Sequence, residues 1–556
     1  MNKDKDLTID ELFKLAVKNH QEDKLDVAQD LYNKVIKVNP KKISAHNNLG
    51  LIFQKLSDYS KAKYYFEKTI EINSNYSNGY FNLGNIYKIL AEPQKAISFY
   101  EKAIEIDPAH INTLNNLGLI FAELGESQKA IKYHEKIITI DPNHTDAHLS
   151  LGLNFFNLGD NQKAKYYYEK AIEINPCYVA AYNNLGVLYS SIGENLKAKN
   201  YFEKVIEIDP NDVSALVNIS QCYIAETDSE EAINSSHKAL KLYHKNSTFI
   251  NQTIPLFRLK HDIEQARYLD SNNYIVNGIK QFEKIGSKIL DRKENIENQS
   301  NYKKKIFLSP EESIALLPFY KSDQIYKTKK ISGSCINPNK NWQDVEDEYL
   351  NSSNQIMYID DFLSEEALIE LRKFCLMSKV WNREYNNKYL GAFSGNGFIS
   401  PIHLQIGIDL KEKLPKLFGI HNLNQFWGFK YDSTLGKGIN IHADFAIHNL
   451  NFWITPDEFN NNKNSGGLKV YDAPAPESWT FKDYNMNSIK IYKFLKDNGA
   501  NCVNIPYKFN RAVLFNSAYF HETDEIDFKD EYEGRRINNT YLFGTRLAKN
   551  KFYSNS

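Results

Sequence analysis

Glycine recurs at a fixed interval of 34 residues through the first half of this 556-residue chain. The members of this series are Gly50, Gly84, Gly118, Gly152 and Gly186. Alanine keeps the same interval at Ala28, Ala62, Ala96, Ala130, Ala164, Ala198 and Ala232, and proline keeps it at Pro108, Pro142, Pro176 and Pro210. Small residues let two helices pack closely, and proline ends a helix. A fixed period of this size is typical of stacked helical units, so residues 9–246 are predicted to form an all-α solenoid of about seven repeats.

The repeated unit resembles the tetratricopeptide repeat in its length and in its glycine, alanine and proline positions. The resemblance implies a superhelix that binds partners on its concave face. A polar column stands two residues before each glycine position, at Asn48, Asn82, Asn116, Ser150, Asn184 and Asn218. It resembles the asparagine ladder of the repeat superhelix in O-GlcNAc transferase, which implies binding of an extended protein or peptide, because an amide both donates and accepts hydrogen bonds. A spacer or oligomerisation role for the array is the alternative.

Composition limits the partners and the compartment of the protein. Lys plus Arg number 68 and Asp plus Glu number 69, which leaves a formal charge of -1. The chain therefore has no net positive charge that would favour nucleic acid or an anionic membrane surface as a partner. The cysteines are scattered without a C-x-x-C pair, and no run approaches the ~20 apolar residues that span a bilayer. We expect a cytoplasmic protein with no nucleic-acid partner and no membrane partner.

The repeat period fails beyond residue 246, where the chain changes character. Residues 247–350 are predicted to form a helical cap on the array, followed by a charged linker. From residue 351 onward, an amphipathic helix near Ser364 precedes short aromatic and β-branched runs such as FWGFKY, LNFWIT and RAVLFN, which Gly, Pro, Asn and Asp clusters separate. This pattern predicts an all-β sandwich or barrel with flanking helices in residues 351–548.

Two histidines and one aspartate of the β-rich half have the types and spacing of metal ligands. His442 and Asp444 are two residues apart, so on a predicted strand their side chains point to one face. His521 ends a later predicted strand, and Arg536 begins another. Two histidines with one carboxylate leave the opposite positions of a metal open, which is the arrangement of non-haem Fe(II) oxygenases. A core histidine bonded to Asp444 is the structural alternative.

These ligands, in this order, resemble the H-x-D…H motif of Fe(II)- and 2-oxoglutarate-dependent dioxygenases of the prolyl-hydroxylase-like type. The resemblance covers residues 351–548 and implies a double-stranded β-helix, or jelly roll. It also implies that His442, Asp444 and His521 hold Fe(II), while 2-oxoglutarate and O2 take the open positions. The family needs no catalytic acid or base from the protein beyond its metal ligands.

The same resemblance implies a binding site for 2-oxoglutarate. Arg536 matches the basic residue that binds the distal carboxylate, and Arg535 is the less favoured alternative. Asn538 and Thr540 share a face with Arg536 on a strand and would add donors. Tyr431, eleven residues before the first histidine, stands near a family position that touches the cosubstrate.

The combination of a peptide-binding array and an oxygenase domain predicts hydroxylation of a protein or peptide side chain. Oxidation of a small molecule or a glycan precursor is one alternative. A protein-interaction scaffold with a non-catalytic jelly roll is another, because a fold does not itself confer activity. Among the remaining polar residues, His403 and His448 are expected to be structural, Trp453 to form core or pocket wall, and Asn451 to be a candidate pocket residue.

Overall fold

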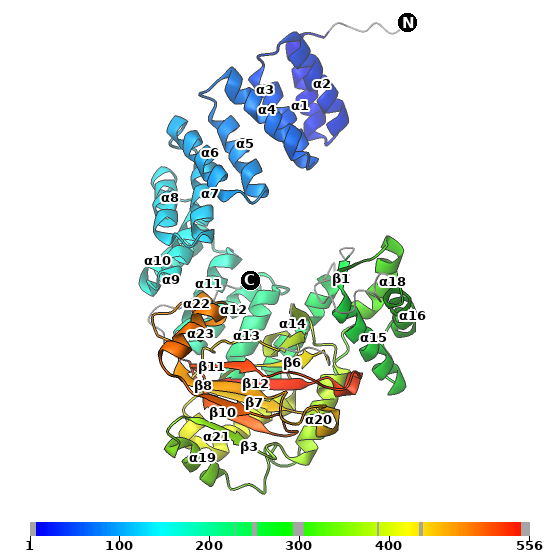
Figure 1. The fold of residues 1–556 in the computed structure, drawn as a ribbon. Coiled ribbons are helices and arrows are strands. Elements are labelled where there is room, and N and C mark those ends of the chain that lie inside the picture. Colours follow the sequence, from blue (N-terminus) through cyan, green and yellow to red (C-terminus); the bar gives the residue numbers. More distant parts are fainter. Residues whose placement is uncertain are drawn as a thin grey trace. The chain divides into compact units, whose positions relative to one another are not determined.

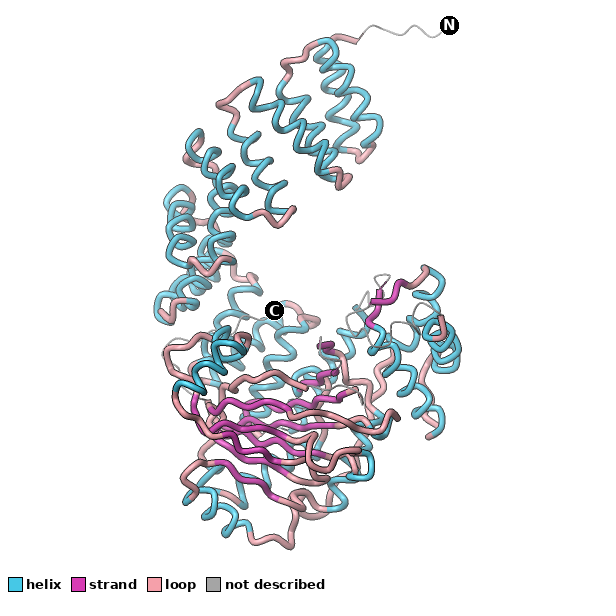
Figure 2. The backbone as a smooth tube through the Cα atoms, in the orientation of Figure 1, coloured by secondary structure: helices cyan, strands magenta, loops and turns pink. Residues whose placement is uncertain are grey.

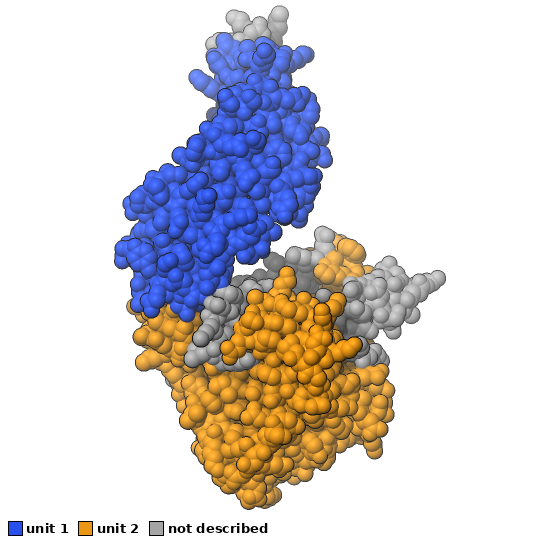
Figure 3. All heavy atoms as spheres, turned by 60° about the vertical axis from the view of Figure 1, so that its left-hand side comes forward, with its two compact units in different colours: residues 1–181 blue, residues 182–556 orange. Residues whose placement is uncertain are grey.

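The computed structural model describes residues 7–227, 229–246, 253–292, 305–385, 389–432 and 438–545. It divides into two compact units, residues 1–181 and 182–556 (Figure 3). The division falls inside the predicted repeat array and not at its expected end near residue 246. The second unit therefore combines the last repeats with the β-rich half of the chain.

The first unit is a stack of helical hairpins, which confirms the predicted all-α repeat (Figures 1 and 2). Its helices are α1 (Ile9–Gln21), α2 (Leu25–Val38), α3 (Ile43–Lys55), α4 (Tyr59–Ile72), α5 (Ser77–Ile89), α6 (Pro93–Ile106), α7 (Ile111–Glu123), α8 (Ser127–Ile140), α9 (Thr145–Asn157) and α10 (Asn161–Ile174). A Cβ at Gly50 would overlap the ring of Phe66, and a Cβ at Gly84 would overlap the ring of Tyr100. The glycine series thus marks where the second helix of each pair inserts an aromatic ring.

The last repeats belong to the second unit and pack against its β-rich half. Their helices are α11 (Val179–Ser191), which begins just before the boundary, α12 (Asn195–Ile208), α13 (Val213–Ala225) and α14 (Ser229–Asn246). Helix α14 contacts η1 (Ser394–Asn396) and α21 (Pro401–Lys413). The Ser236 hydroxyl donates to the Ser394 carbonyl at 2.6 Å and accepts from the Gly397 N–H at 2.7 Å. Residues 394–413 thus provide most of the cover for the last repeat, where the sequence predicts a cap in residues 247–350.

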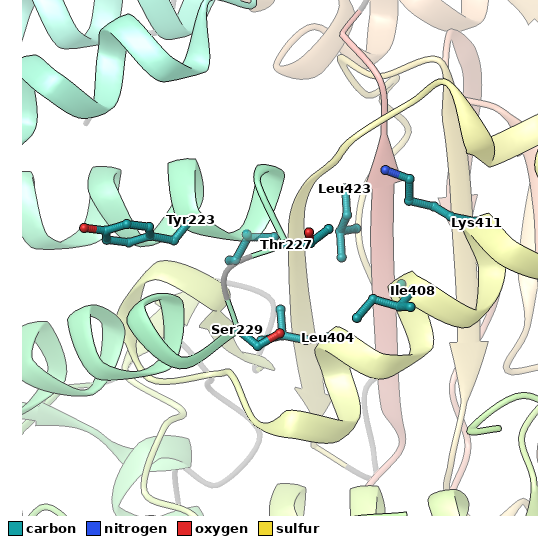
Figure 4. Close-up of a pocket in the computed structure, with 9 residues that line it drawn as sticks. Tyr223, Thr227, Ser229, Leu404, Ile408, Lys411 and Leu423 are labelled. Atoms are coloured by element: carbon teal, nitrogen blue, oxygen red, sulfur yellow. The ribbon is translucent and has the colours of Figure 1, made fainter. Parts of the chain in front are cut away.

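A small apolar pocket lies at this junction (Figure 4). Tyr223 and Thr227 of the last repeat line it together with Leu404 and Ile408 of α21. The pocket lies within the second unit, and most of its lining residues come from α13, α14, α21 and the strand that begins at Leu423. It lies apart from the predicted metal ligands, none of which lines it.

Replacing Gly397 by alanine is expected to destabilise the second unit by about 2–4 kcal/mol. The residue has a φ of +89°, and an added Cβ would lie 3.1 Å from Cγ of the buried Leu240 on α14. Gly499 is the matched control, since it has a φ of +63° but no atom within 4 Å of an added Cβ. Thermal unfolding of both variants measures the difference. Equal losses at the two positions would contradict a tight contact between the last repeat and the β-rich half.

The described residues 253–292 and 305–351 are built into the second unit and are more than a cap or a linker. The described elements are β1 (Thr253–Pro255), α15 (Leu256–Ser271), α16 (Ile279–Leu290), β2 (Lys305–Phe307), α18 (Pro310–Tyr320) and α19 (Trp342–Asn351). Helix α15 packs on α16 and on α20 (Glu365–Met377), the predicted amphipathic helix that Ser364 caps. Glu264 of α15 also pairs with Arg535 at 2.7 Å. This segment therefore supports the β-rich half.

Two antiparallel sheets form the centre of the second unit (Figure 1). The seven-stranded sheet has the order β3-β10-β7-β12-β6-β5-β4, and the three-stranded sheet has the order β11-β8-β9. The strands are β3 (Ile356–Ile359), β4 (Arg383–Tyr385), β5 (Tyr389–Phe393), β6 (Leu423–Tyr431), β7 (His448–Trp453), β8 (Leu468–Pro474), β9 (Cys502–Ile505), β10 (Ala512–Asn516), β11 (Tyr519–Thr523) and β12 (Ile537–Phe543). The remaining short helices are η2 (Pro415–Gly419), η3 (Asp457–Phe459), α22 (Phe481–Asn485), α23 (Ser488–Asp497) and η4 (Tyr532–Gly534).

The two faces of the seven-stranded sheet have different coverings. On one face, Phe426 and Leu450 pack with Leu371 of α20 and Ile406 of α21 in a single apolar core. On the other face, residues of β6, β7 and β10 form a second core with β8 and β9 of the smaller sheet. Because side chains alternate along a strand, one face of β6, β7 and β12 points into the space between the sheets. The predicted all-β sandwich with flanking helices is observed in this region.

Candidate metal and cosubstrate site

The three predicted metal ligands lie together at the edge of the smaller sheet. His521 is on β11, and His442 faces it through two backbone hydrogen bonds of 3.0 and 2.8 Å. The N–H of Asp444 bonds to the carbonyl of Ser517 at 3.1 Å. One ligand atom from each side chain lies within 4.8 Å of the other two. The sequence predicts a strand through His442 and Asp444, but this is wrong, since the structure has only an isolated bridge there and β7 begins at His448.

Both histidines present the same ring nitrogen to the centre of this cluster. Nδ1 of His442 lies 2.8 Å from the Asn440 carbonyl, and Nδ1 of His521 lies 3.1 Å from the Tyr519 carbonyl. A carbonyl oxygen can only accept, so each Nδ1 carries a proton and Nε2 is the ring nitrogen that remains for a ligand. Burial lowers the pKa of His442 to about 4, with His521 adding to the effect, so its imidazole is neutral at pH 7. Donation of the Nδ1 proton to a backbone carbonyl is the usual arrangement of histidine ligands.

The carboxylate of Asp444 completes the cluster. Its Oδ1 lies 3.8 Å from Nε2 of His442, and its Oδ2 lies 3.4 Å from Nε2 of His521. Burial works to raise its pKa, but the neighbouring histidines and a hydrogen bond from Asn449 outweigh burial and hold the pKa below its ordinary value. Asp444 is therefore ionised at neutral pH. Two imidazole nitrogens and one anionic oxygen form a donor set that suits a divalent transition metal.

A small pocket, with a cavity volume of about 20 Å³, opens beside the cluster, between the two sheets. Its apolar wall consists of Trp427, Phe429, Ile439 and Leu468. Its polar residues, besides the three ligands, are Asn451, Thr523, Arg536, Asn538 and Thr540. Apolar walls with a few convergent polar groups are typical of a binding site for a small molecule.

Arg536 brings a buried positive charge to this pocket. It is 1% exposed, and its Nε donates to the Gly466 carbonyl at 2.6 Å. Its guanidinium carbon lies 4.8 Å from the ring centre of Tyr431 and 5.5 Å from that of Trp453. Within the described part of the chain, Nη1 has no hydrogen-bond partner and the side chain forms no salt bridge. Burial lowers the pKa of Arg536. A buried cation with no acid at salt-bridge distance can bind an anion that enters the pocket.

The two adjacent arginines have different environments. Arg535 pairs with Glu264 at 2.7 Å and with Asp432 at 3.8 Å, and it does not line the pocket. Arg536 lines the pocket and faces no acid at salt-bridge distance among the described residues. The geometry therefore favours Arg536 over Arg535 as a cosubstrate ligand. The reason is the alternation of side chains along the extended chain that enters β12.

The other residues predicted to bind the cosubstrate lie near Arg536. They differ in their hydrogen bonds and in whether they line the pocket. Asn538 and Thr540 share the pocket face of β12, as predicted, but both donate to Oδ1 of Asn451, at 3.0 and 2.6 Å. Tyr431 is fully buried with its ring against Arg536, and its hydroxyl has no hydrogen-bond partner in the described part of the structure. It does not line the pocket itself.

Several side chains have the structural positions that the sequence predicts, and the sequence analysis did not identify one residue of the site. His448 packs against Phe418 and His421, and Trp453 is a fully buried core residue. Asn451 lines the pocket, as predicted. The missed residue is Asn449, which donates to Asp444 at 2.6 Å. The N-x-N alternation in HNLNFW could have indicated it, since residues two apart on a strand share a face.

Side chains of the predicted asparagine column form hydrogen bonds with other residues of the array. In the first unit, the amide of Asn48 donates to the Tyr32 hydroxyl at 3.0 Å, and that of Asn82 donates to Asn47 at 2.8 Å. Asn116 donates to Asn85 at 3.0 Å. Asn184 and Asn218 lie half-buried on α11 and α13 of the second unit. Peptide binding by this column stays a prediction, and the partners inside the array would hold each amide in one orientation.

Comparison with known proteins identifies the helical region. Residues 42–109, 78–143 and 109–176 match a family model of the tetratricopeptide repeat, and residues 179–212 match a second one. Residues 42–176 and 179–212 are thus tetratricopeptide repeats, a class of repeat that binds proteins or peptides. No curated protein sequence matches the chain. None of the described helices is long and apolar enough to cross a membrane.

Solved structures with similar repeats cover part of the chain. YrrB, described as a TPR protein with an unusual peptide-binding site, is 23% identical over 33% of this chain and 95% of its own, with a TM-score of 0.30. MamA is 30% identical over 30% of this chain and 96% of its own, with a TM-score of 0.28. A tetratricopeptide repeat protein from Parabacteroides merdae is 20% identical over 42% of this chain and 91% of its own, with a TM-score of 0.35.

Proposed function

We propose that residues 351–548 form an Fe(II)- and 2-oxoglutarate-dependent hydroxylase that acts on a protein or peptide bound by the repeats. One observation carries the proposal. Two imidazole Nε2 atoms and one carboxylate oxygen converge beside a pocket that also contains a buried arginine with no acid at salt-bridge distance among the described residues. A purely structural His-Asp cluster would not require that second feature.

The order of the strands supports a double-stranded β-helix for this domain. Along the chain, β6 and β7 lie in the seven-stranded sheet, β8 and β9 in the smaller one, β10 in the first, β11 in the second and β12 in the first again. The bridge at His442 adds the segment between β6 and β7 to the edge of the smaller sheet. Repeated crossing between two antiparallel sheets is typical of jelly rolls.

The residues present fit Fe(II). His442, Asp444 and His521 would hold the ion, because their donor atoms are close enough to share one metal and both Nδ1 protons are fixed on carbonyls. Three protein ligands would leave positions for the cosubstrate and O2. With these bound, the centre would supply the oxidising chemistry for hydroxylation of a C–H bond, and the protein would supply binding, orientation and shielding from water.

The residues present also fit 2-oxoglutarate. Nη1 of Arg536 offers an unused donor and a positive charge for a carboxylate, and the nearby rings exclude water from this end of the pocket. Trp427, Phe429 and Leu468 would pack against the carbon chain of the cosubstrate and keep the site dry. Asn538 and Thr540 would shape the pocket through their bonds to Asn451.

The substrate class is inferred from the fusion with a repeat array. Tetratricopeptide repeats bind peptides or proteins, so a segment held by the array could be delivered to the oxygenase domain. Peptides captured by the wild-type protein would be incubated with Fe(II), 2-oxoglutarate and O2, and analysed by mass spectrometry. We expect some of them to gain the mass of one oxygen atom. Turnover of 2-oxoglutarate with small molecules but with no captured peptide would favour a small-molecule substrate instead.

Replacing Asn82 by alanine is expected to weaken peptide binding by roughly 2–10-fold, the usual worth of one hydrogen bond. Asn75 is the matched control, since it is exposed in the turn before α5 and outside the column. Fluorescence anisotropy with a captured peptide measures both variants. Equal affinities of the two variants would remove the column from the binding site without affecting the oxygenase proposal.

A further inference from the structure

A chain of uncharged polar side chains runs through the space between the sheets and ends on the carboxylate of Asp444. Nδ2 of Asn449 donates to Oδ2 of Asp444 at 2.6 Å, and Nδ2 of Asn451 donates to Oδ1 of Asn449 at 2.6 Å. Oδ1 of Asn451 accepts from the Thr540 hydroxyl at 2.6 Å and from Asn538 at 3.0 Å. Asn538 also donates to the Thr540 hydroxyl at 3.0 Å.

Every member of this chain is buried and held in one orientation. Asn449 is 0% exposed, and Asn451, Asn538 and Thr540 are at most 6% exposed. An ionised carboxylate can only accept, so Asn449 must turn its amide nitrogen toward Asp444. Its oxygen then accepts from Asn451, whose own oxygen is fixed by two donors from β12. Hydrogen bonds aligned in this way polarise and strengthen one another.

The strand register explains why these residues meet. Thr540 is opposite Asn451 in the pairing of β12 with β7, and residues two apart on each strand share the face between the sheets. A run of buried asparagines is costly in an apolar core unless each finds a partner. Here the hydrogen bonds connect the asparagines to the carboxylate of Asp444. This connection explains why asparagines occupy these positions.

We propose that Asn449 is a positioning residue for Asp444, which fixes Oδ2 and leaves Oδ1 as the single oxygen offered to a metal. This inference rests on the proposed function. Oδ1 lies 3.8 Å from Nε2 of His442, whereas Oδ2 accepts from Asn449 and lies 3.4 Å from Nε2 of His521. Binding through both oxygens would use an additional metal position, which a hydroxylase needs for its cosubstrate or O2. Asn451 orients Asn449 through a hydrogen bond, and residues of β12 orient Asn451 in the same way.

The test uses Co(II) as a probe on the full-length metal-free protein. Asn449→Leu has nearly the same shape but cannot donate. We expect it to bind Co(II) about 10–100-fold more weakly than the wild type, the usual effect of removing an outer hydrogen bond to a metal ligand. Its visible ligand-field bands should also shift, because the carboxylate becomes free to bind through both oxygens. Asn451→Leu should give a smaller loss in the same direction.

The control is Asn539→Leu. Asn539 is a fully buried asparagine of β12 whose side-chain atoms have no hydrogen-bond partner among the described residues. It should bind Co(II) like the wild type. Equal affinities and spectra for Asn449→Leu and the wild type would overturn the inference, and so would equal losses at positions 449 and 539. If Asn449→Leu does not fold, Asn451→Leu decides by the same criteria. Failure of the wild type to bind Co(II) would instead overturn the proposed function.

Discussion

Replacing His442 by alanine is expected to weaken divalent metal binding by more than about 100-fold, beyond the effect of an outer hydrogen bond. The change removes one of three donors and leaves two, which cannot hold the ion in an open facial arrangement. The fold should remain, because the pairing of His442 with His521 uses only backbone N–H and carbonyl groups. Calorimetric titration with Co(II), together with circular dichroism, measures both properties.

His448→Ala is the control for this prediction. The residue lies six positions further on, but its ring packs against Phe418 and His421 and not in the pocket. It should lose stability by about 1–3 kcal/mol and keep its metal affinity. Retained metal binding in His442→Ala, or loss of binding in His448→Ala with the fold intact, would contradict the assignment of the ligands.

Replacing Arg536 by methionine is expected to weaken 2-oxoglutarate binding by roughly 10–150-fold, the worth of about 1.5–3 kcal/mol for hydrogen bonds to a charged group. Metal binding should be unchanged, since Arg536 is not a ligand. The metal-free variant should lose little stability. The lost bonds to the carbonyls of Gly466 and Gly467 are offset by removal of an unpaired charge from an aromatic environment.

Arg535→Met is expected to have the opposite effects on stability and on cosubstrate binding. This change leaves Glu264 and Asp432 without their cation and should cost about 3–5 kcal/mol of stability while the cosubstrate affinity is retained. Isothermal titration with 2-oxoglutarate in the presence of Co(II), and thermal unfolding, separate the two effects. Loss of cosubstrate binding in Arg535→Met at a temperature where it is folded would reverse the assignment of the two arginines.

Features that depend on local spacing could be predicted from the sequence. The period of the glycines gives the repeat, because each helical hairpin needs a small residue where an aromatic ring inserts, as at Gly84 and Tyr100. Alternation along a strand places Arg536, Asn538 and Thr540 on one face, which the structure confirms. The types and spacing of the residues at 442, 444 and 521 were enough to predict that these three side chains lie together.

Features that depend on contacts between distant segments could not be predicted. The ion pair of Arg535 joins residues 271 positions apart, and nothing in the local sequence indicates it. The cover of the last repeat by residues 394–413 also requires the full fold. The N-x-N pattern of HNLNFW could indicate Asn449 as a site residue, but its hydrogen bond to Asp444 could not be predicted, because the loop before β7 is not the strand that its alternating pattern suggests.

The central claim is a shared site for Fe(II) and 2-oxoglutarate, and one measurement tests it most directly. The metal-free protein is titrated anaerobically with Fe(II) and then with 2-oxoglutarate while the visible absorption spectrum is recorded. The account predicts a charge-transfer band that appears only when both are present and that is absent in His442→Ala and in Arg536→Met. A folded wild-type protein without this band would contradict the account, and the repeat array would then be the functional part of the molecule.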